Sequence, residues 1–364
     1  MNADVIREFA EIPTQIQELR NLRPDAVSQA QASFEALLEA DTTLTRAERY
    51  AIAAAVAEIH QQPQALALYS EYAEDEPVAA AHQERVQAAI EVAQLITIEP
   101  KAASREVLGH LTQWYSDDDI ISIFQLLSFL AFQLRVVHGL RVLAGQEVNL
   151  GMRGIQPDTS TWTQTERVLT HPEAVHPTTF VRHSLGWLPW IEPLTTDALT
   201  SEQWDALINP DRASSPYFRL LARDAAALKA RTLTDFDIFY NVTGGLGRAE
   251  RELAATAASL HNGCEFCTSV HAGRTVVESG NEQAVDALLS DLNADLGSAA
   301  WNAIRDAAVA LTTLEFGSEH IAHLRAAGLD DTDIIDTINA ASFFNWANRL
   351  MLGLGEPDVP VRYR

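Results

Sequence analysis

RAERELAATAASLHNGCEFCTSVHAGRTVVESG (Arg248–Gly280) carries the clearest structural signals in this chain. Leu246, Leu253 and Leu260 recur at seven-residue steps, which is typical of the apolar face of an amphipathic helix. The Asn-Gly pair that follows, with Gly263 as its left-handed residue, predicts that this helix stops there. A second helix opens near the first cysteine and runs to the end of the quoted stretch. These residues therefore predict a helical hairpin.

Helical signals also dominate on both sides of the hairpin. Ala-rich stretches with apolar residues at three- and four-residue steps recur, and no long alternating run of β-branched residues appears. Asp330–Leu352 is expected to form another long helix, because its early aspartates suit the positive N-terminal end of a helix. Residues 145–216 are rich in proline and tryptophan, which indicates a linker followed by short helices and loops. We expect its tryptophans to pack in the protein or to line a substrate channel. The fold class predicted is all-α.

Two pairs of segments repeat in the same order. Thr45–Arg49 matches Gly247–Arg251 at a shift of 202 residues, and each opens an Ala-rich helix. Ser128–Leu140 matches Ser342–Leu354 at a shift of 214, and an aspartate cluster precedes both segments by the same interval. We therefore predict a duplicated helical unit. The expected parts are a first domain over 1–150, a Pro/Trp-rich linker and wrapping segment over 151–215, and a second domain over 216–364.

The composition indicates a globular protein with an acidic surface. Its 364 residues include 26 Lys and Arg against 50 Asp and Glu, a net charge of −24, and 47% are hydrophobic. Such a surface repels phosphate, so we expect neither nucleic acid nor an anionic membrane as a partner. The most apolar stretch, Ile120–Val137, is interrupted by polar residues, and the N-terminus lacks the basic and apolar regions of a signal peptide. We expect a cytoplasmic protein.

The two cysteines of the chain are the most informative residues for chemistry. Cys264 and Cys267 cannot form a disulfide framework for a protein of this size, so a redox or metal-binding role is expected. With His271 they occupy one stripe of a helix, and the helix N-terminus favours a thiolate. Glu252 lies on the preceding helix, where the hairpin can bring its carboxylate to the imidazole. A thiol, a base and an acid that orients the base form a complete proton-transfer set.

The pattern Glu-(eleven residues)-Cys-x-x-Cys-x-x-x-His resembles that of the alkylhydroperoxidase D proteins, within the carboxymuconolactone decarboxylase superfamily. The segment Phe343–Gly355 is also similar to the tail of the peroxidase-related branch. The resemblance extends from about Tyr217 to Gly355 and covers the N-terminal half only as a degenerate copy. It implies two tandem all-α domains. It also implies a homo-oligomer, either a trimer of fused repeats or a dimer.

The resemblance assigns a role to each of the four residues. Cys267 would attack the peroxide and become a sulfenic acid, and Cys264 would resolve it by closing a disulfide. His271 and Glu252 would form the proton relay. The implied partners are a small hydroperoxide and a dithiol reductant, lipoyl-linked in the family, with no metal, haem or flavin as cofactor. Phe266 stands where well-known members carry a further histidine, so the relay is shorter here.

The N-terminal copy lacks these reactive groups. Tyr50 corresponds to Glu252 at the shift of 202, and the stretch His60–Ser70 contains no cysteine. We therefore expect residues 1–150 to be structural, either completing an oligomer or covering the active half. Because His60 persists there, His261 is interpreted as a helix-end residue.

Several alternative interpretations stay open from the residues alone. The cysteine pair could be inert core packing, a redox-responsive switch in a non-enzymatic or structural oligomer, or part of a zinc site. Decarboxylases of the superfamily lack the cysteine pair, which makes lactone decarboxylation the less favoured activity. His320 and His323 are expected on an exposed helix face. Thr243–Gly247, TGGLG, is expected to form a turn and not a phosphate loop.

Overall fold

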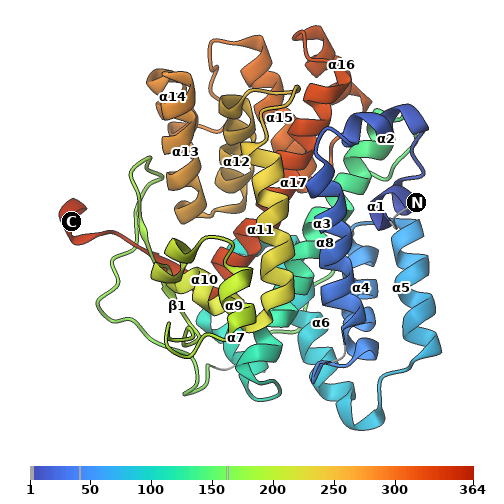
Figure 1. Cartoon of the computed structure of the whole chain (residues 1–364), viewed down its shortest axis with the longest axis vertical. Helices are drawn as coiled ribbons and strands as arrows, with labels where there is room; N and C mark the ends of the chain where they lie inside the picture. The colour runs from blue at the N-terminus through green and yellow to red at the C-terminus, as the bar shows by residue number, and fades with distance from the viewer. Residues whose placement is uncertain (1–3, 41, 161, 163) are drawn as a thin grey trace.

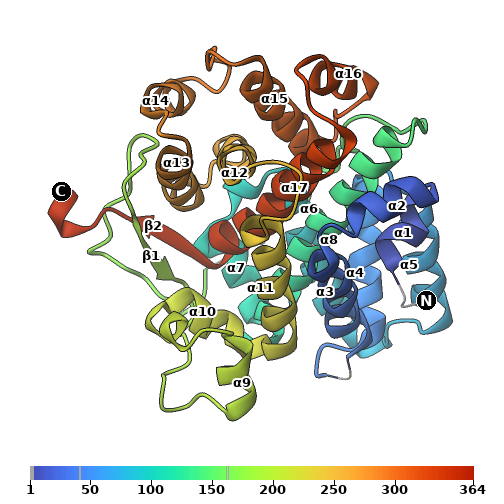
Figure 2. The same ribbon diagram turned by 45° about the horizontal axis from the view of Figure 1, so that its top comes forward.

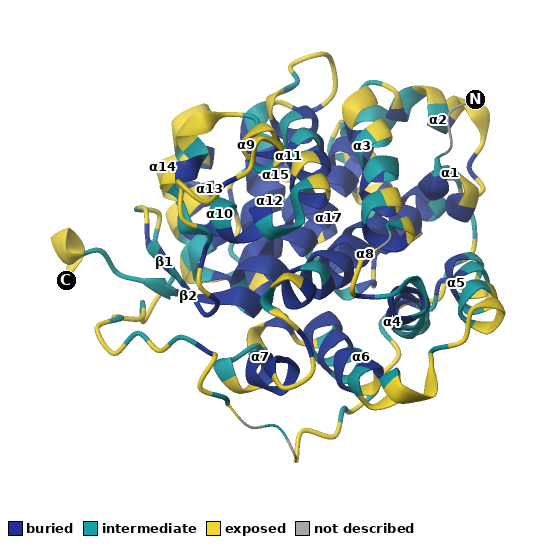
Figure 3. Cartoon of the chain, turned by 60° about the horizontal axis from the view of Figure 1, so that its bottom comes forward, coloured by how far each residue is buried: buried dark blue, intermediate teal, exposed yellow. Residues whose placement is uncertain are grey.

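Two long helices, α8 (Asp117–Leu143) and α17 (Asp331–Leu354), pack against each other at the centre of the molecule (Figure 1). The computed structural model describes residues 4–40, 42–160, 162 and 164–364. Each long helix begins with a capping box, in which Ser116 or Asp330 caps the first turn. Both are buried along most of their length (Figure 3).

The other helices surround this central pair, and the all-α fold class is confirmed. In the N-terminal half they are α1 (Val5–Ala10), α2 (Thr14–Arg20), α3 (Pro24–Phe34), α4 (Arg46–Ile59), α5 (Pro63–Asp75), α6 (Gln83–Ile98) and α7 (Arg105–Thr112). In the C-terminal half they are α9 (Ser201–Ala206), α10 (Pro216–Leu221), α11 (Ala225–Tyr240), α12 (Arg248–Asn262), α13 (Glu265–Ser279), α14 (Glu282–Ser290), α15 (Ala299–Thr313) and α16 (Ser318–Ala326). A π-helical turn, Glu35–Glu39, extends α3.

Helix α8 is long and apolar enough, by length and composition, to cross a membrane. Its most apolar window is 94% buried inside the molecule, which is the environment of a core helix. Helices apolar on all sides need such burial, and α17 and the surrounding helices provide it.

Glycines allow the two central helices to approach closely. Gly139 on α8 faces Ile338 on α17, and a Cβ atom at Gly139 would lie 2.8 Å from the Ile338 Cγ2 atom. In the same way Gly353 on α17 faces the Phe124 ring on α8, which leaves no room for a Cβ atom. The two glycines are 214 residues apart, and so are the two side chains that they face. The contacts are therefore reciprocal.

Buried arginines connect the two halves in the same reciprocal way. Arg135 on α8 donates from Nη2 to the Thr312 carbonyl at 2.8 Å, and Arg349 on α17 donates from Nη2 to the Thr97 carbonyl at 2.7 Å. Burial lowers the pKa of Arg349 to about 9. These hydrogen bonds offset part of the cost of burying the two guanidinium groups, although the Nε atom of Arg349 has no partner in the described residues.

Helices α3 and α11 also lie side by side and extend the contact between the halves. At the start of α3, Arg23 forms an ion pair with Asp336 of α17 at 2.7 Å. At the start of α11, Asp224 accepts a hydrogen bond from Ser122 of α8 at 2.8 Å. One buried apolar cluster runs through both halves of the described chain.

The segment between the halves contributes one strand to a small sheet that the sequence did not indicate. β1 (Gly186–Pro189) pairs antiparallel with β2 (Gly355–Asp358) in a two-stranded sheet beside α10 (Figure 2). The pairing joins segments about 170 residues apart, so no local pattern announces it. Trp187 and Trp190 are buried there, and the Trp187 indole donates to the Met351 carbonyl at 3.0 Å. Trp204 is instead more than one-third exposed.

Candidate functional site

The hairpin predicted from the sequence is formed by α12 and α13, which lie next to α17 (Figure 2). α12 ends at Asn262, and Gly263 closes it with a φ of 72°, in the left-handed region that favours glycine. Cys264 occupies the N-cap position of α13, and Cys267 lies in its first turn. The turn therefore sets both sulfurs at the positive end of a helix. His261 lies exposed in the last turn of α12, as expected of a helix-end residue.

The hairpin brings Glu252 and His271 together. The distance from the His271 Nδ1 atom to the Glu252 Oε2 atom is 2.5 Å. The other oxygen of Glu252, which is fully buried, accepts from Arg248 at 2.5 Å. The His271 ring also contacts Phe344 of α17, with ring centroids 4.1 Å apart. The imidazole is thus held by a carboxylate on one side and an aromatic ring on another.

This contact sets the charge state of both partners. Burial alone would lower the pKa of His271, but the charge and hydrogen bond of Glu252 raise that pKa above its usual value. Burial would likewise raise the pKa of Glu252, and the charges and hydrogen bonds of His271 and Arg248 lower it. The pair therefore favours an imidazolium next to a carboxylate.

The two cysteines are free thiols with opposite shifts. Burial, and then the hydrogen bond to Cys267, raise the pKa of Cys264 well above its usual range. Burial alone would also raise the pKa of Cys267, but the hydrogen bond from Cys264 and the charge of His271 lower it. The side chain of Asn348 and the charge of Arg231 act in the same direction. Cys267 is the thiol poised to ionise.

Cys267 and His271 line a pocket of about 170 Å³. Most of the other lining side chains are apolar or aromatic and come from α10, α13 and α17: Tyr217, Phe218, Phe266, Val270, Phe343, Phe344, Ala347 and Met351. Val270 is exposed, so the pocket reaches the surface. Cys264 and Glu252 do not line the pocket. Cys264 lies behind Cys267, and Glu252 lies behind His271. Phe266, at the position of the family histidine, contributes a wall and no proton-transfer group.

Three polar residues of this pocket were not identified from the sequence. Arg231 and Asp235, one turn apart on α11, line it together with Tyr217 at the start of α10. Burial raises the pKa of Asp235, while the charges of Arg231 and His271 act against that shift. No motif marks these residues, because they reach the cysteines only through the packing of α10 and α11. Arg248 carried a local signal, since it precedes Glu252 by one helical turn.

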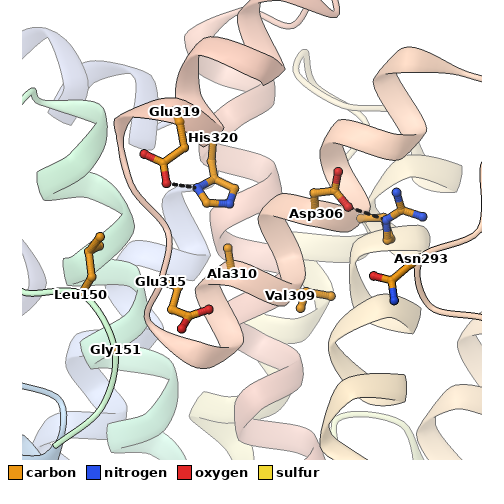
Figure 4. Close-up of a pocket in the computed structure, with 10 residues that line it drawn as sticks. Leu150, Gly151, Asn293, Asp306, Val309, Ala310, Glu315, Glu319 and His320 are labelled. Atoms are coloured by element: carbon orange, nitrogen blue, oxygen red, sulfur yellow. Dashed lines mark hydrogen bonds and ion pairs between the residues drawn. The ribbon is translucent and has the colours of Figure 1, made fainter.

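The remaining polar motifs lie away from this pocket. A larger pocket of about 480 Å³ lies beside α15 and α16, where Glu319 pairs with His320 and Arg305 pairs with Asp306 (Figure 4). His320 Nδ1 accepts from the Gly317 amide and caps α16, while His323 is exposed. Both histidines therefore fit a surface helix. Residues 243–247 form the expected turn before α12, with positive φ at two of its glycines.

Neither a metal site nor a second reactive site is visible in the described residues. Within that part of the chain, no three or more His, Cys, Asp or Glu side chains are arranged to hold a metal ion. In the N-terminal half, Tyr50 packs near Tyr69, with ring centroids 6.1 Å apart. Tyr69 stands 202 residues before His271 and donates to Gln133 at 2.6 Å. At the same shift His60 corresponds to Asn262, and not to His261.

The fold and the site thus define an all-α protein with a cysteine pair beside a His–Glu pair. Residues 225–310 match the model of the carboxymuconolactone decarboxylase family. The match runs from the start of α11 into α15 and includes the hairpin with Glu252, both cysteines and His271. Among curated proteins, none matches the chain significantly. The similarity supports a relation to this superfamily and a function at that level.

Proposed function

We propose that this protein is a thiol-dependent peroxidase, an alkyl hydroperoxide reductase-like disulfide oxidoreductase. One observation carries the proposal: the Cys267 sulfur opens on a pocket, with the Cys264 thiol as a hydrogen-bond donor and the His271–Glu252 pair beside it. Thiolates and not thiols are nucleophilic, and a thiolate in a pocket reacts with a peroxide that enters it. Plain core packing of cysteines gives no reason for a sulfur that lines a pocket together with a histidine bound to a buried carboxylate.

The proposed reaction has three steps. The Cys267 thiolate attacks the terminal peroxide oxygen, the O–O bond breaks, and the leaving alkoxide takes a proton from His271. The Cys264 sulfur then attacks the Cys267 sulfenic acid, forms the disulfide and releases water. An external dithiol reduces this disulfide by thiol–disulfide exchange and is itself oxidised. The exchange that regenerates the Cys267 thiolate releases one proton, which returns to His271. Glu252 keeps the imidazole oriented and favours its protonated form.

We further propose that the N-terminal half is a degenerate copy of the same helical unit with a structural role. The reciprocal contacts between Gly139 and Ile338 and between Gly353 and Phe124 support this, because both pairs of positions are 214 residues apart. Tyr50 and Tyr69, whose rings pack together, correspond to Glu252 and His271 at the sequence shift of 202 residues. The copy would complete an assembly from fused repeats in a reducing, cytoplasmic environment.

Replacing each cysteine separately tests the peroxidase. Cys267→Ser is expected to abolish consumption of cumene hydroperoxide, because serine is not a comparable nucleophile. Cys264→Ser is expected to allow one oxidation of Cys267 to a sulfenic acid, which dimedone traps, but no disulfide. Full peroxide consumption by the Cys267→Ser protein would end the assignment.

Steady-state kinetics separate the enzyme from a redox-responsive switch. With a dithiol such as dihydrolipoamide in excess, a peroxidase turns over many times per molecule. One stoichiometric oxidation of the wild-type protein and no further reaction would instead favour the non-enzymatic alternative. Lack of any peroxide reaction, with turnover of a lactone, would favour decarboxylation.

The pKa of the Cys267 thiol gives an independent test. We expect pH-dependent alkylation to give a pKa below the ordinary value of about 8.5 in the wild type. His271→Ala should raise that pKa, because the nearby imidazolium charge is lost. His261→Ala is the matched control, since this exposed histidine lies outside the pocket and should change nothing. An ordinary pKa in wild type and His271→Ala alike would remove the case for an activated thiol.

A further inference from the structure

Arg231 is a buried cation that forms no ion pair within the described residues. Its side chain is 5% exposed and lines the Cys267 pocket, yet within the described chain it makes no hydrogen bond or ion pair. Its guanidinium packs on the faces of aromatic rings. The Arg231 Cζ atom lies 5.0 Å from the centroid of the nearest ring, Phe343. The buried Nε atom has no hydrogen-bond partner in the described residues, which is costly, and the side chain lines a pocket from which a partner outside the chain can reach it.

The neighbouring hydroxyl of Tyr217 is unsatisfied as well. This residue is 8% exposed, lines the same pocket, and its Oη atom has no hydrogen-bond partner in the described residues. Burial raises the pKa of Tyr217 to about 12, so the hydroxyl is a proton donor at neutral pH. The Arg231 Cζ atom lies 5.9 Å from the Tyr217 ring centroid. Two unused donors thus face one small pocket.

Within the described residues, no carboxylate of the chain is bound to the Arg231 guanidinium. Asp235 is the opposing carboxylate on the pocket wall, and it forms no ion pair with Arg231. Glu252 is buried behind His271 and already neutralised by Arg248. The lining therefore holds two cations, Arg231 and the His271 imidazolium, and of these only Arg231 forms no ion pair. Guanidinium groups bind carboxylates through two parallel hydrogen bonds, which suits a planar carboxylate.

The size and lining of the pocket limit how large and how polar the part of the ligand beyond its anionic group can be. A dry cavity of about 150 Å³ lined by aliphatic and aromatic side chains is large enough for benzene. At about 170 Å³, with walls such as Phe266 and Phe344, this pocket suits a body of one ring or a short branched alkyl group. We propose that Arg231 and Tyr217 form a carboxylate-binding subsite, so that the substrate is a small organic hydroperoxide with an apolar body and a carboxylate. This inference rests on the proposed peroxidase function.

Kinetics with matched substrates test the subsite. Cumene hydroperoxide and its meta- and para-carboxylate derivatives share the reacting group and differ by one charge. We expect wild-type kcat/KM to be about tenfold higher for at least one carboxylate, mainly through KM. Arg231→Met keeps an apolar side chain against the aromatic rings and should remove that preference. Tyr217→Phe should reduce it by a smaller factor.

Two controls separate recognition from thiol activation. Arg212→Met removes a charge stacked on Phe218 but not part of the pocket lining, so the substrate preference should persist. If Arg231 serves only to stabilise the Cys267 thiolate, Arg231→Met will slow all substrates equally and raise the pKa of Cys267. That result, or a wild type without preference for either carboxylate, would overturn the subsite.

A binding experiment covers the case in which no peroxide is turned over. Isothermal titration calorimetry of the Cys267→Ser protein with 4-isopropylbenzoate measures binding without catalysis. We expect saturable binding that cumene does not reproduce and that Arg231→Met weakens about tenfold. If 4-isopropylbenzoate binds but the wild-type protein turns over no peroxide, the peroxidase proposal is rejected and the carboxylate-binding subsite is retained. Absence of binding would reject the site itself.

Discussion

Glu252 and His271 depend on each other for their charge state. The carboxylate is fully buried, and its two oxygens are bound by His271 and Arg248. Removing the carboxylate leaves the imidazole next to Phe344, where only the smaller effects of Cys267 and Asp235 oppose burial, which favours the neutral ring. The same contact thus decides both the electrostatics at Cys267 and part of the stability of the hairpin.

Glu252→Gln tests this dependence directly. We expect the pKa of His271 to fall, because the charge and hydrogen bond that most strongly oppose the effect of burial are lost. Peroxide turnover should fall by about 10²-fold or more, as expected when a proton relay is broken. NMR titration of the imidazole measures the first effect. An unchanged pKa of His271 would contradict the arrangement.

The pair also makes the stability depend on pH. The pKa of His271 is raised on folding, so its stabilisation is present below about pH 6.5 and is lost as the pH rises through the folded pKa. The pKa of Glu252 is lowered, so its stabilisation is present above about pH 4.5 and is lost as the pH falls through the folded pKa. The contribution is therefore largest between those two values.

Urea unfolding of wild type and Glu252→Gln across pH 4 to 9 measures that window. We expect a difference in the free energy of unfolding of about 3 kcal/mol near pH 5.5, which is typical of a broken buried pair. The difference should shrink toward pH 9. If this difference in the free energy of unfolding grew with rising pH, the predicted upward shift of the His271 pKa on folding would be wrong.

At the scale of elements, the close approach of α8 and α17 depends on two glycines. Gly139 lies against Ile338, and Gly353 lies against Phe124. An added methyl group at either glycine must displace a fully buried side chain, because the helix backbones are held by flanking contacts.

Gly139→Ala and Gly353→Ala are each expected to destabilise the protein by about 1–3 kcal/mol through overpacking. Phe124→Leu should partly rescue Gly353→Ala, because a smaller side chain frees space at that contact. Gly154→Ala is the control, since a Cβ atom there meets nothing within 4 Å. Chemical denaturation measures all four variants, and equal stability of the Gly139→Ala and control proteins would contradict the contact.

At the scale of the whole molecule, the two halves share one core. The apolar cluster includes residues from Val5 to Leu354, and Arg135 and Arg349 each donate across the contact between the halves. Neither half can therefore lose its packing without exposing apolar surface of the other.

We expect the full chain to unfold in a single cooperative transition. Far-UV circular dichroism and tryptophan fluorescence should give the same midpoint in urea, because helices and core are lost together. Arg349→Met should shift both midpoints equally. Two separate transitions would indicate independently stable domains with a boundary near the predicted linker.

The sequence by itself determined what depends on local patterns. Leucine spacing and Gly263 defined the helical hairpin, and the aspartates before α17 marked the start of that helix within one residue. The i, i+3, i+7 spacing of Cys264, Cys267 and His271 follows from helix geometry, and the spacing to Glu252 follows from the hairpin. Such signals extend over one or two helical turns, and a single sequence displays them.

The tertiary structure decided everything that joins distant segments. Only the packing of α10, α11 and α17 on the hairpin leaves Cys267 lining a pocket and Cys264 behind it. The same packing brings in Arg231, and it pairs β1 with β2 across the molecule. These contacts depend on the shapes and volumes of buried side chains far apart in the chain. Helix periodicity and capping depend on residues close together in the sequence, so they do not predict such contacts. The packing of a core depends on the side chains of all its elements at once.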